Sequence, residues 1–190
     1  MKRRGWLGGL LGAVLLAACA TPRAPVLPDS AGGEDFSLTG RVLVRQGERA
    51  EVLRMYWHHL AAADKVSLET SLGQTVAEID LDDEIGRAKL ADGRELSEED
   101  DLVLARKLLG SPVPLRRFAD WVRAQTPASA VVERDDQGRV LRAHESDWQL
   151  AYSGYGDFAA TPDLPSLVEA RRADILVRLK IEEWTRGRQP

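Results

Sequence analysis

The sequence predicts a mainly β fold with some α, in which about nine to eleven antiparallel strands form a barrel or strongly curled sheet covered by two short helices. Three observations support this prediction. Apolar residues recur at every second position in most segments after residue 36, turn signals separate those segments, and helical spacing occurs only in the middle of the chain. Such a sheet with a helical cover is a natural container for an apolar ligand.

The predicted strands lie in two groups, one on each side of the helices. In the first strand, Phe36, Leu38, Val42 and Val44 share one face by their period of two, and Asp92-Gly93 is a strong turn signal after the first group. The predicted strands cover residues 36–45, 50–59, 64–70, 74–81 and 85–91 before the helices, and 130–135, 139–145, 147–155, 166–172 and 175–184 after them.

Two amphipathic helices are predicted between these groups. Ser97 to Asp100 has a spacing related to a capping box, and Gly110 is a natural C-terminal stop for the first helix. The second helix is predicted over residues 115–125, which place apolar side chains on one face. We expect these helices to cover one open face or mouth of the sheet.

The first nineteen residues resemble a bacterial lipoprotein signal. Lys2, Arg3 and Arg4 precede twelve small or apolar residues, a run too short to span a membrane but suitable for a secretory signal. The run ends in Leu16-Ala17-Ala18-Cys19, which resembles a lipobox and contains the only cysteine of the chain. We therefore expect residues 1–18 to be a signal peptide and Cys19 to be acylated. The other interpretation is an ordinary secretory signal with a chance cysteine.

Composition limits what the mature chain can bind. The three cations of the leader contribute to a formal net charge of −4, so its removal leaves −7, which disfavours nucleic-acid binding. Residues 19–35 contain three prolines and two glycines, and this composition predicts a flexible tether after the acylated cysteine. Residues 36–190 are then the folded domain, which we expect to be a monomer.

The sequence offers little that would support catalysis. His58 and His59 are neighbours on one predicted strand and should point to opposite faces, so they cannot share a metal ion. No zinc-protease, nucleophile-elbow or phosphate-loop motif is present in the sequence. We therefore expect neither an enzyme nor a bound cofactor or metal.

Several segments along the chain occur in a characteristic order and spacing. After the lipobox come Gly40-Arg41 and Tyr56-Trp57, and the order and spacing of the remaining segments add specificity. These segments are LETSLG (68–73), the Asp92-Gly93 turn, LLGSPVPLRRFADWV (108–122), WQLAYSGY (148–155) and LKIEEW (179–184). Together these segments resemble the LolB family of outer-membrane lipoprotein insertion proteins, and the resemblance covers residues 36–184.

The resemblance implies an incomplete antiparallel β-barrel whose helices form a lid over a hydrophobic cavity. It implies a protein anchored in the outer membrane and facing the periplasm, which accepts lipoproteins from the periplasmic carrier LolA and inserts them into the inner leaflet. The sequence departs from the family's usual pattern at Ser71, where a proline is common, and in the short, proline-rich segment before the first strand.

Several residues are candidates for the site. Leu72 lies in a tight link between two strands and aligns with the loop leucine that the family uses for membrane insertion, although a turn leucine can also fold back on its neighbours. The cavity-lining candidates, of which about half are expected to face ligand, are Leu43, Tyr56, Trp57, Phe118, Trp121, Trp148 and Tyr152.

The main alternative function is a structural outer-membrane lipoprotein that scaffolds an envelope complex. A transfer protein requires an internal apolar cavity, whereas a scaffold should have a packed core and a large exposed apolar patch. An anchored hydrolase is a weaker third possibility, because no catalytic group is evident.

Overall fold

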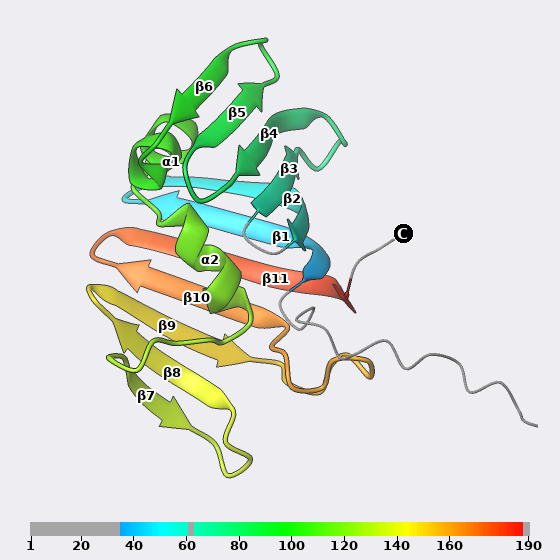
Figure 1. Ribbon diagram of the computed structural model, residues 1–190, viewed down its shortest axis with the longest axis vertical. Helices are drawn as coiled ribbons and strands as arrows, with labels where there is room; N and C mark the ends of the chain where they lie inside the picture. The colour runs from blue at the N-terminus through cyan, green and yellow to red at the C-terminus, as the bar shows by residue number, and fades with distance from the viewer. Residues whose placement is uncertain (1–34, 61–62, 188–190) are drawn as a thin grey trace, which may run out of the picture. The chain divides into compact units, whose positions relative to one another are not determined.

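The first and last strands of the domain pair with each other at the centre of one large antiparallel sheet. The computed structural model describes residues 35–60 and 63–187, all within one structural unit that spans residues 31–190. In these ranges eleven strands follow the order β6-β5-β4-β3-β2-β1-β11-β10-β9-β8-β7 (Figure 1). Among the described residues no strand pairs with the outer side of β6 or β7, so the sheet is an open one, as the prediction of an incomplete barrel requires.

The strands are two antiparallel meanders joined through β1 and β11. The first meander comprises β1 (Phe36–Gln46), β2 (Arg49–Leu60), β3 (Ala63–Glu69), β4 (Thr75–Leu81), β5 (Gly86–Leu90) and β6 (Glu95–Glu98). The second comprises β7 (Val131–Arg134), β8 (Val140–Glu145), β9 (Trp148–Ser153), β10 (Leu167–Arg172) and β11 (Ile175–Arg186). Helices α1 (Asp101–Leu109) and α2 (Leu115–Val122) connect the two edge strands β6 and β7.

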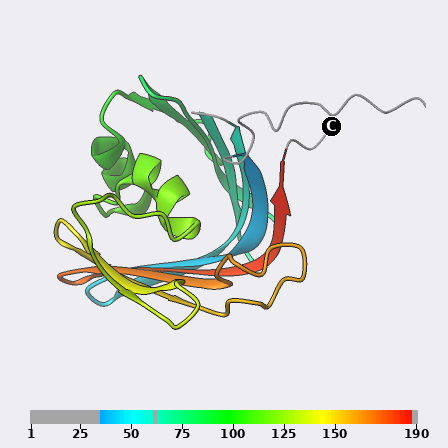
Figure 2. The same cartoon turned by 60° about the horizontal axis from the view of Figure 1, so that its bottom comes forward.

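The two helices lie on the concave side of the sheet (Figure 2). Because β6 and β7 are opposite edges, the segment that joins them has to cross the sheet, and the helices form along that crossing. The predicted helical cover is therefore confirmed. None of the helices in the described ranges is long and apolar enough to cross a membrane.

Gly40 marks a point where the sheet bends. The pairing of β1 with β11 shifts register between Thr39 and Gly40, which indicates a bulge. A Cβ atom at Gly40 would lie 2.4 Å from the carbonyl oxygen of Lys180, so only glycine permits the two backbones to approach this closely. The bulge contributes to the curvature that brings the sheet around the helices.

The start of α1 differs from the prediction. Ser97 belongs to β6, a short strand that the sequence pattern did not indicate, and the helix cap is Asp100, whose side chain accepts a hydrogen bond from the Leu102 amide at 2.8 Å. Gly110 ends the helix in the left-handed conformation with φ of 72°, as predicted. The second helix ends at Val122, earlier than predicted, because Ala124 turns the chain with φ of 55°.

Candidate functional site

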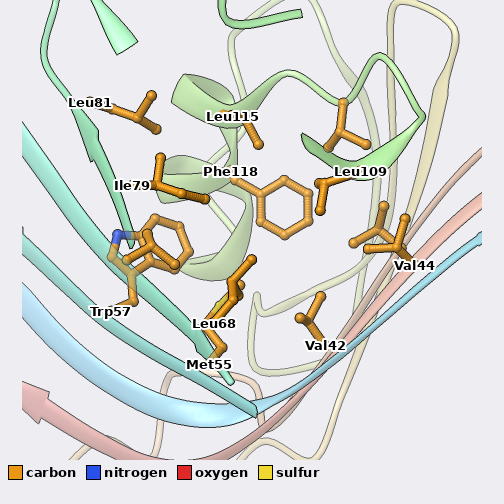
Figure 3. Close-up of a pocket in the computed structure, with 13 residues that line it drawn as sticks. Val42, Val44, Met55, Trp57, Leu68, Ile79, Leu81, Leu109, Leu115 and Phe118 are labelled. Carbon is orange, nitrogen blue, oxygen red and sulfur yellow. The ribbon is translucent and has the colours of Figure 1, made fainter. Parts of the chain in front are cut away.

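An entirely apolar pocket lies between the concave face of the sheet and the two helices (Figure 3). Its volume is about 60 Å³. The 13 residues that line it are Val42, Val44, Met55, Trp57, Val66, Leu68, Ile79, Leu81, Leu109, Val113, Leu115, Phe118 and Val177. Since about 10–15 Å³ admits one water-sized group, the pocket accommodates roughly five such groups, which is less than a long acyl chain needs.

Strand alternation and register together build the floor of this pocket. Every second residue of β1 to β4 points to the concave side, so each of these strands contributes two lining side chains. The register then aligns Trp57 with Val66 and Val66 with Ile79 across β2, β3 and β4. The result is an apolar surface built by four strands, and Phe118 of α2 lies on the opposite side of the pocket.

The Trp57 ring is held in the pocket wall by buried polar groups. Its Nε1 donates a 2.6 Å hydrogen bond to Oδ1 of Asp64, and the same oxygen lies 2.7 Å from Nδ1 of His59. Phe36 stacks on the His59 ring and meets Trp57 edge-on. In Figure 3 the indole nitrogen is on the side away from Phe118. The polar edge of Trp57 is therefore satisfied outside the pocket, and its hydrocarbon surface lines the cavity.

Of the seven cavity-lining candidates, Trp57 and Phe118 line this pocket. The prediction for Leu43 is wrong, because its neighbours Val42 and Val44 point into the pocket and Leu43 therefore points to the convex side, where it pairs with Val52 and Arg178. The prediction that Tyr56 lines the cavity is wrong for the same reason. It lies beside His58 on the convex face, whereas His59 is buried, so the two histidines point to opposite sides as predicted.

Trp121, Trp148 and Tyr152 are also absent from the pocket lining. They are buried in another part of the same hydrophobic core, Trp121 on α2 and the other two on β9, and we call these three residues the aromatic cluster. The ring centroids of Trp121 and Trp148 are 5.3 Å apart, and Phe118 lies 5.5 Å from Trp121, at the border between the cluster and the pocket. These three candidates are core residues in this structure and not cavity-lining ones.

Charged groups hold the aromatic cluster in place. Trp121 Nε1 donates to Oε2 of Glu145 at 2.9 Å, and Arg117 Nε donates to Oε1 of the same carboxylate at 2.7 Å. Burial alone would raise the pKa of Glu145, but these hydrogen bonds outweigh it and hold the pKa below its ordinary value. The Arg172 guanidinium lies over the Trp148 ring at 5.0 Å. Burial raises the pKa of Tyr152, whose hydroxyl has no hydrogen-bond partner among the described residues.

Leu72 is at the tip of the link between β3 and β4, and 86% of its surface is exposed. The link is tight because the Thr70 amide donates to the Gln74 carbonyl at 2.8 Å and Gly73 adopts φ of +78°. Thr70 Oγ1 also accepts from the Leu72 amide at 3.3 Å. The alternative in which Leu72 folds back on its neighbours is therefore excluded in this structure.

Sequence reasoning missed most of the pocket, because it favoured aromatic residues over aliphatic ones. The lining is mainly valine, leucine and isoleucine from alternate strand positions, together with Leu109 and Val113 from the end of α1 and the segment after it. Val42 and Val44 on one strand, and Met55 and Trp57 on the next, each lie two positions apart and so share a face. This spacing was the signal in the sequence that could have identified them as lining residues. For Leu109 and Val113 no comparable pattern exists, since their positions depend on how the chain crosses the sheet.

The open sheet curled over an apolar pocket defines the class of protein. A solved structure of a LolA superfamily protein from Nitrosomonas europaea superposes with a TM-score of 0.55, over 83% of this chain and 88% of its own, at 8% sequence identity. This likeness shows that the two proteins share a fold.

The chain belongs to the Outer membrane lipoprotein LolB family, whose family model matches residues 34–184. A relative from Azoarcus sp. (strain BH72), named outer-membrane lipoprotein LolB, is 34% identical over 176 residues, covering 90% of this chain and 89% of its own. A protein of the same name from Dechloromonas aromatica (strain RCB) is 32% identical over 181 residues, covering 92% and 94%. The family predicted from the sequence is thereby confirmed.

Proposed function

We propose that this protein is anchored in the outer membrane, accepts lipoproteins from the periplasmic carrier LolA and inserts them into the inner leaflet. The observation that carries the proposal is the wholly apolar pocket beneath the helices, together with membership of the LolB family. Acyl chains would pass between apolar sites without a nucleotide. Each buried methylene contributes ~0.8 kcal/mol, so small differences between the sites add up along a chain.

The anchor in this proposal is Cys19, which lies outside the described residues. Two or more acyl chains give stable attachment, whereas one binds a membrane only marginally. Mass spectrometry of the native protein should find a mature chain that begins at an acylated Cys19. An unmodified cysteine or a different N-terminus would contradict this part of the proposal.

The exposed Leu72 supports a role in delivery to the membrane. Transfer of a leucine side chain from water to lipid contributes ~1.5–3 kcal/mol, which is modest beside acyl anchors but sufficient to bring the domain into close contact with the bilayer. In contrast, the exposed large apolar residues of the described ranges lie apart on β2, β7 and the β3–β4 link. This dispersal favours lipid transfer over the scaffold alternative, which requires one extended patch.

The test measures uptake and delivery separately on the same variant. The full-length chain in proteoliposomes receives a lipoprotein from loaded carrier, and delivery into the bilayer is then followed. Leu72→Glu should leave folding and uptake near the wild-type level and reduce delivery about tenfold or more, because a carboxylate resists transfer into the interface.

Val131→Glu provides the matched control, because Val131 is also an exposed apolar residue, on β7, with 73% of its surface accessible. It should affect neither step. Equal loss of uptake and delivery with Leu72→Glu would identify Leu72 as a carrier contact, and normal delivery would exclude it as the membrane probe. Failure of the wild-type chain to take up any lipoprotein would overturn the proposed function.

A further inference from the structure

A second hollow of about 520 Å³ adjoins the apolar pocket. We call it the hairpin hollow, because most of its lining comes from the ends of β1 and β2 that form one hairpin. Its residues are Val44, Gln46, Arg49, Ala50, Glu51, Leu53, Leu109 and Gly110. Val44 and Leu109 also line the apolar pocket, so one wall of half-buried side chains separates the two spaces.

The two spaces differ in chemistry. The apolar pocket contains no charged residue, whereas the hairpin hollow presents the Gln46 amide, the Arg49 guanidinium and the Glu51 carboxylate. Arg49 and Glu51 are exposed, and neither forms an ion pair with a residue in the described ranges. Their donors and acceptors remain accessible to a ligand in the hollow.

The wall between the two spaces continues into the segment that joins α1 to α2. Ser111, fully buried, donates from Oγ to Oε1 of Gln46 at 2.9 Å, and Arg172 donates from Nη2 to the Pro112 carbonyl at 3.3 Å. Beyond these contacts Val113 points into the apolar pocket. The segment is thus fastened to β1 on one side and to β10 on the other, and it runs along the rim where the two spaces meet.

We propose that the hairpin hollow binds the polar end of the acylated ligand, namely the ester and amide groups of an N-terminally acylated cysteine. An acyl chain of that ligand then passes between Val44 and Leu109 into the apolar pocket. This inference rests on the proposed function, because it assigns a second part of the same lipid ligand. In such a ligand the polar head group is joined directly to the acyl chains, just as the hairpin hollow adjoins the apolar pocket.

The chemistry of the hollow matches those groups. The Arg49 guanidinium carries only donors and suits ester and amide carbonyl oxygens, and the Glu51 carboxylate accepts from an amide N–H. The Gln46 side chain keeps its NH₂ donors, since Ser111 occupies its oxygen. The small pocket volume further implies that Leu109 shifts when a long chain passes, because Leu109 lies at the shared wall.

Two photoreactive lipopeptides test this assignment. Both are triacylated cysteinyl peptides, one with a diazirine beside the cysteinyl amide and one with a diazirine at the end of an acyl chain. Each is crosslinked to the full-length chain in proteoliposomes, and the modified residues are mapped by mass spectrometry. The head probe should label residues 46–53, and the tail probe should label lining residues of the apolar pocket such as Met55 and Leu68.

A charge-reversal variant tests the role of Arg49 in binding the polar head group. Arg49→Glu should lower labelling of residues 46–53 by the head probe about tenfold, as expected for loss of a charge-assisted hydrogen bond with added repulsion of carbonyl oxygens. Arg87→Glu is the matched control, an exposed arginine on β5 whose labelling pattern should equal that of the wild type.

Different labelling results would contradict this inference and the proposed function. Tail labelling in the pocket with head labelling outside residues 46–53 would overturn the hairpin hollow and leave the proposed function intact. Unchanged head labelling in Arg49→Glu would overturn the role of Arg49. Absence of labelling by either probe in the wild-type chain would overturn lipid binding itself, and with it both proposals.

Discussion

The apolar pocket and the aromatic cluster occupy neighbouring parts of the same concave face, yet they are built in different ways. The pocket is lined by aliphatic side chains with two aromatic rings, Trp57 and Phe118. In the aromatic cluster the rings of Trp121 and Trp148 lie 5.3 Å apart and each contacts a charged residue, and Tyr152 is buried on the same strand as Trp148. Helix α2 contributes to both, since Phe118 contacts the pocket and Trp121, one turn later, belongs to the cluster.

The difference lies in what fixes each side chain. Trp121 is held by Glu145, which Arg117 also contacts, so a shift of the ring would break a partly buried charge-assisted hydrogen bond. The aliphatic lining of the pocket has no such partners, and branched or flexible apolar side chains can repack at a modest cost. The aromatic cluster therefore supports α2 rigidly, while the pocket beside it can adjust to a ligand.

The largest expected effect is on stability, from truncation within the aromatic cluster. Trp121→Ala should lower the free energy of unfolding by about 3–5 kcal/mol, because it removes a fully buried indole and leaves Glu145 without one of its donors. Chemical denaturation followed by circular dichroism measures the change. Val131→Ala at an exposed position should stay within about 0.5 kcal/mol of the wild type. A small effect of Trp121→Ala would contradict the conclusion that the aromatic cluster supports α2.

A matched pair on β1 compares the two faces of the sheet. Val42→Glu places a carboxylate among the apolar pocket residues and should abolish acyl-chain uptake, with a cost of several kcal/mol for burying or neutralising the charge. Leu43→Glu, one residue later, points to the convex side and should leave uptake unchanged.

Lipoprotein uptake and unfolding are measured on both variants of this pair, so that loss of binding is distinguished from loss of folding. Equal uptake in the two variants would show that the concave pocket does not receive acyl chains.

The smallest expected effect is on the pH dependence of stability. The pKa of Glu145 in the folded protein lies below its ordinary value of 4.5, so its interactions stabilise the fold above that pH and are lost as the pH falls through the lowered value. Glu145→Gln should therefore show a weaker decline in the free energy of unfolding between about pH 5 and about pH 3. Denaturation curves at several pH values measure this slope. An identical slope in the variant would contradict the account of how Glu145 secures Trp121.

Local sequence patterns were sufficient for most of the architecture. Period-two alternation and turn residues predicted ten of the strands, and helical spacing with Gly110 predicted α1 and its end. β6 was missed because Ser97 and Glu98 read equally well as the start of a helix, and four residues are too few for alternation to decide. The tight Ser71-Leu72-Gly73 link also sufficed to predict that Leu72 has little chance to join the core.

The sequence by itself determined which residues of each strand share a face, the positions of the turns and the class of fold. Only the tertiary structure decided which face of β1 and β2 becomes concave, because alternation is the same pattern whichever face is covered. For that reason Leu43 and Tyr56 were assigned to the wrong side, while Val42 and Trp57 line the pocket. Likewise, only packing across the sheet decided that Trp121 and Trp148 fill the core, since Trp121 on α2 meets Glu145 on β8, and Trp148 on β9 meets Arg172 on β10, in each case a residue far along the chain.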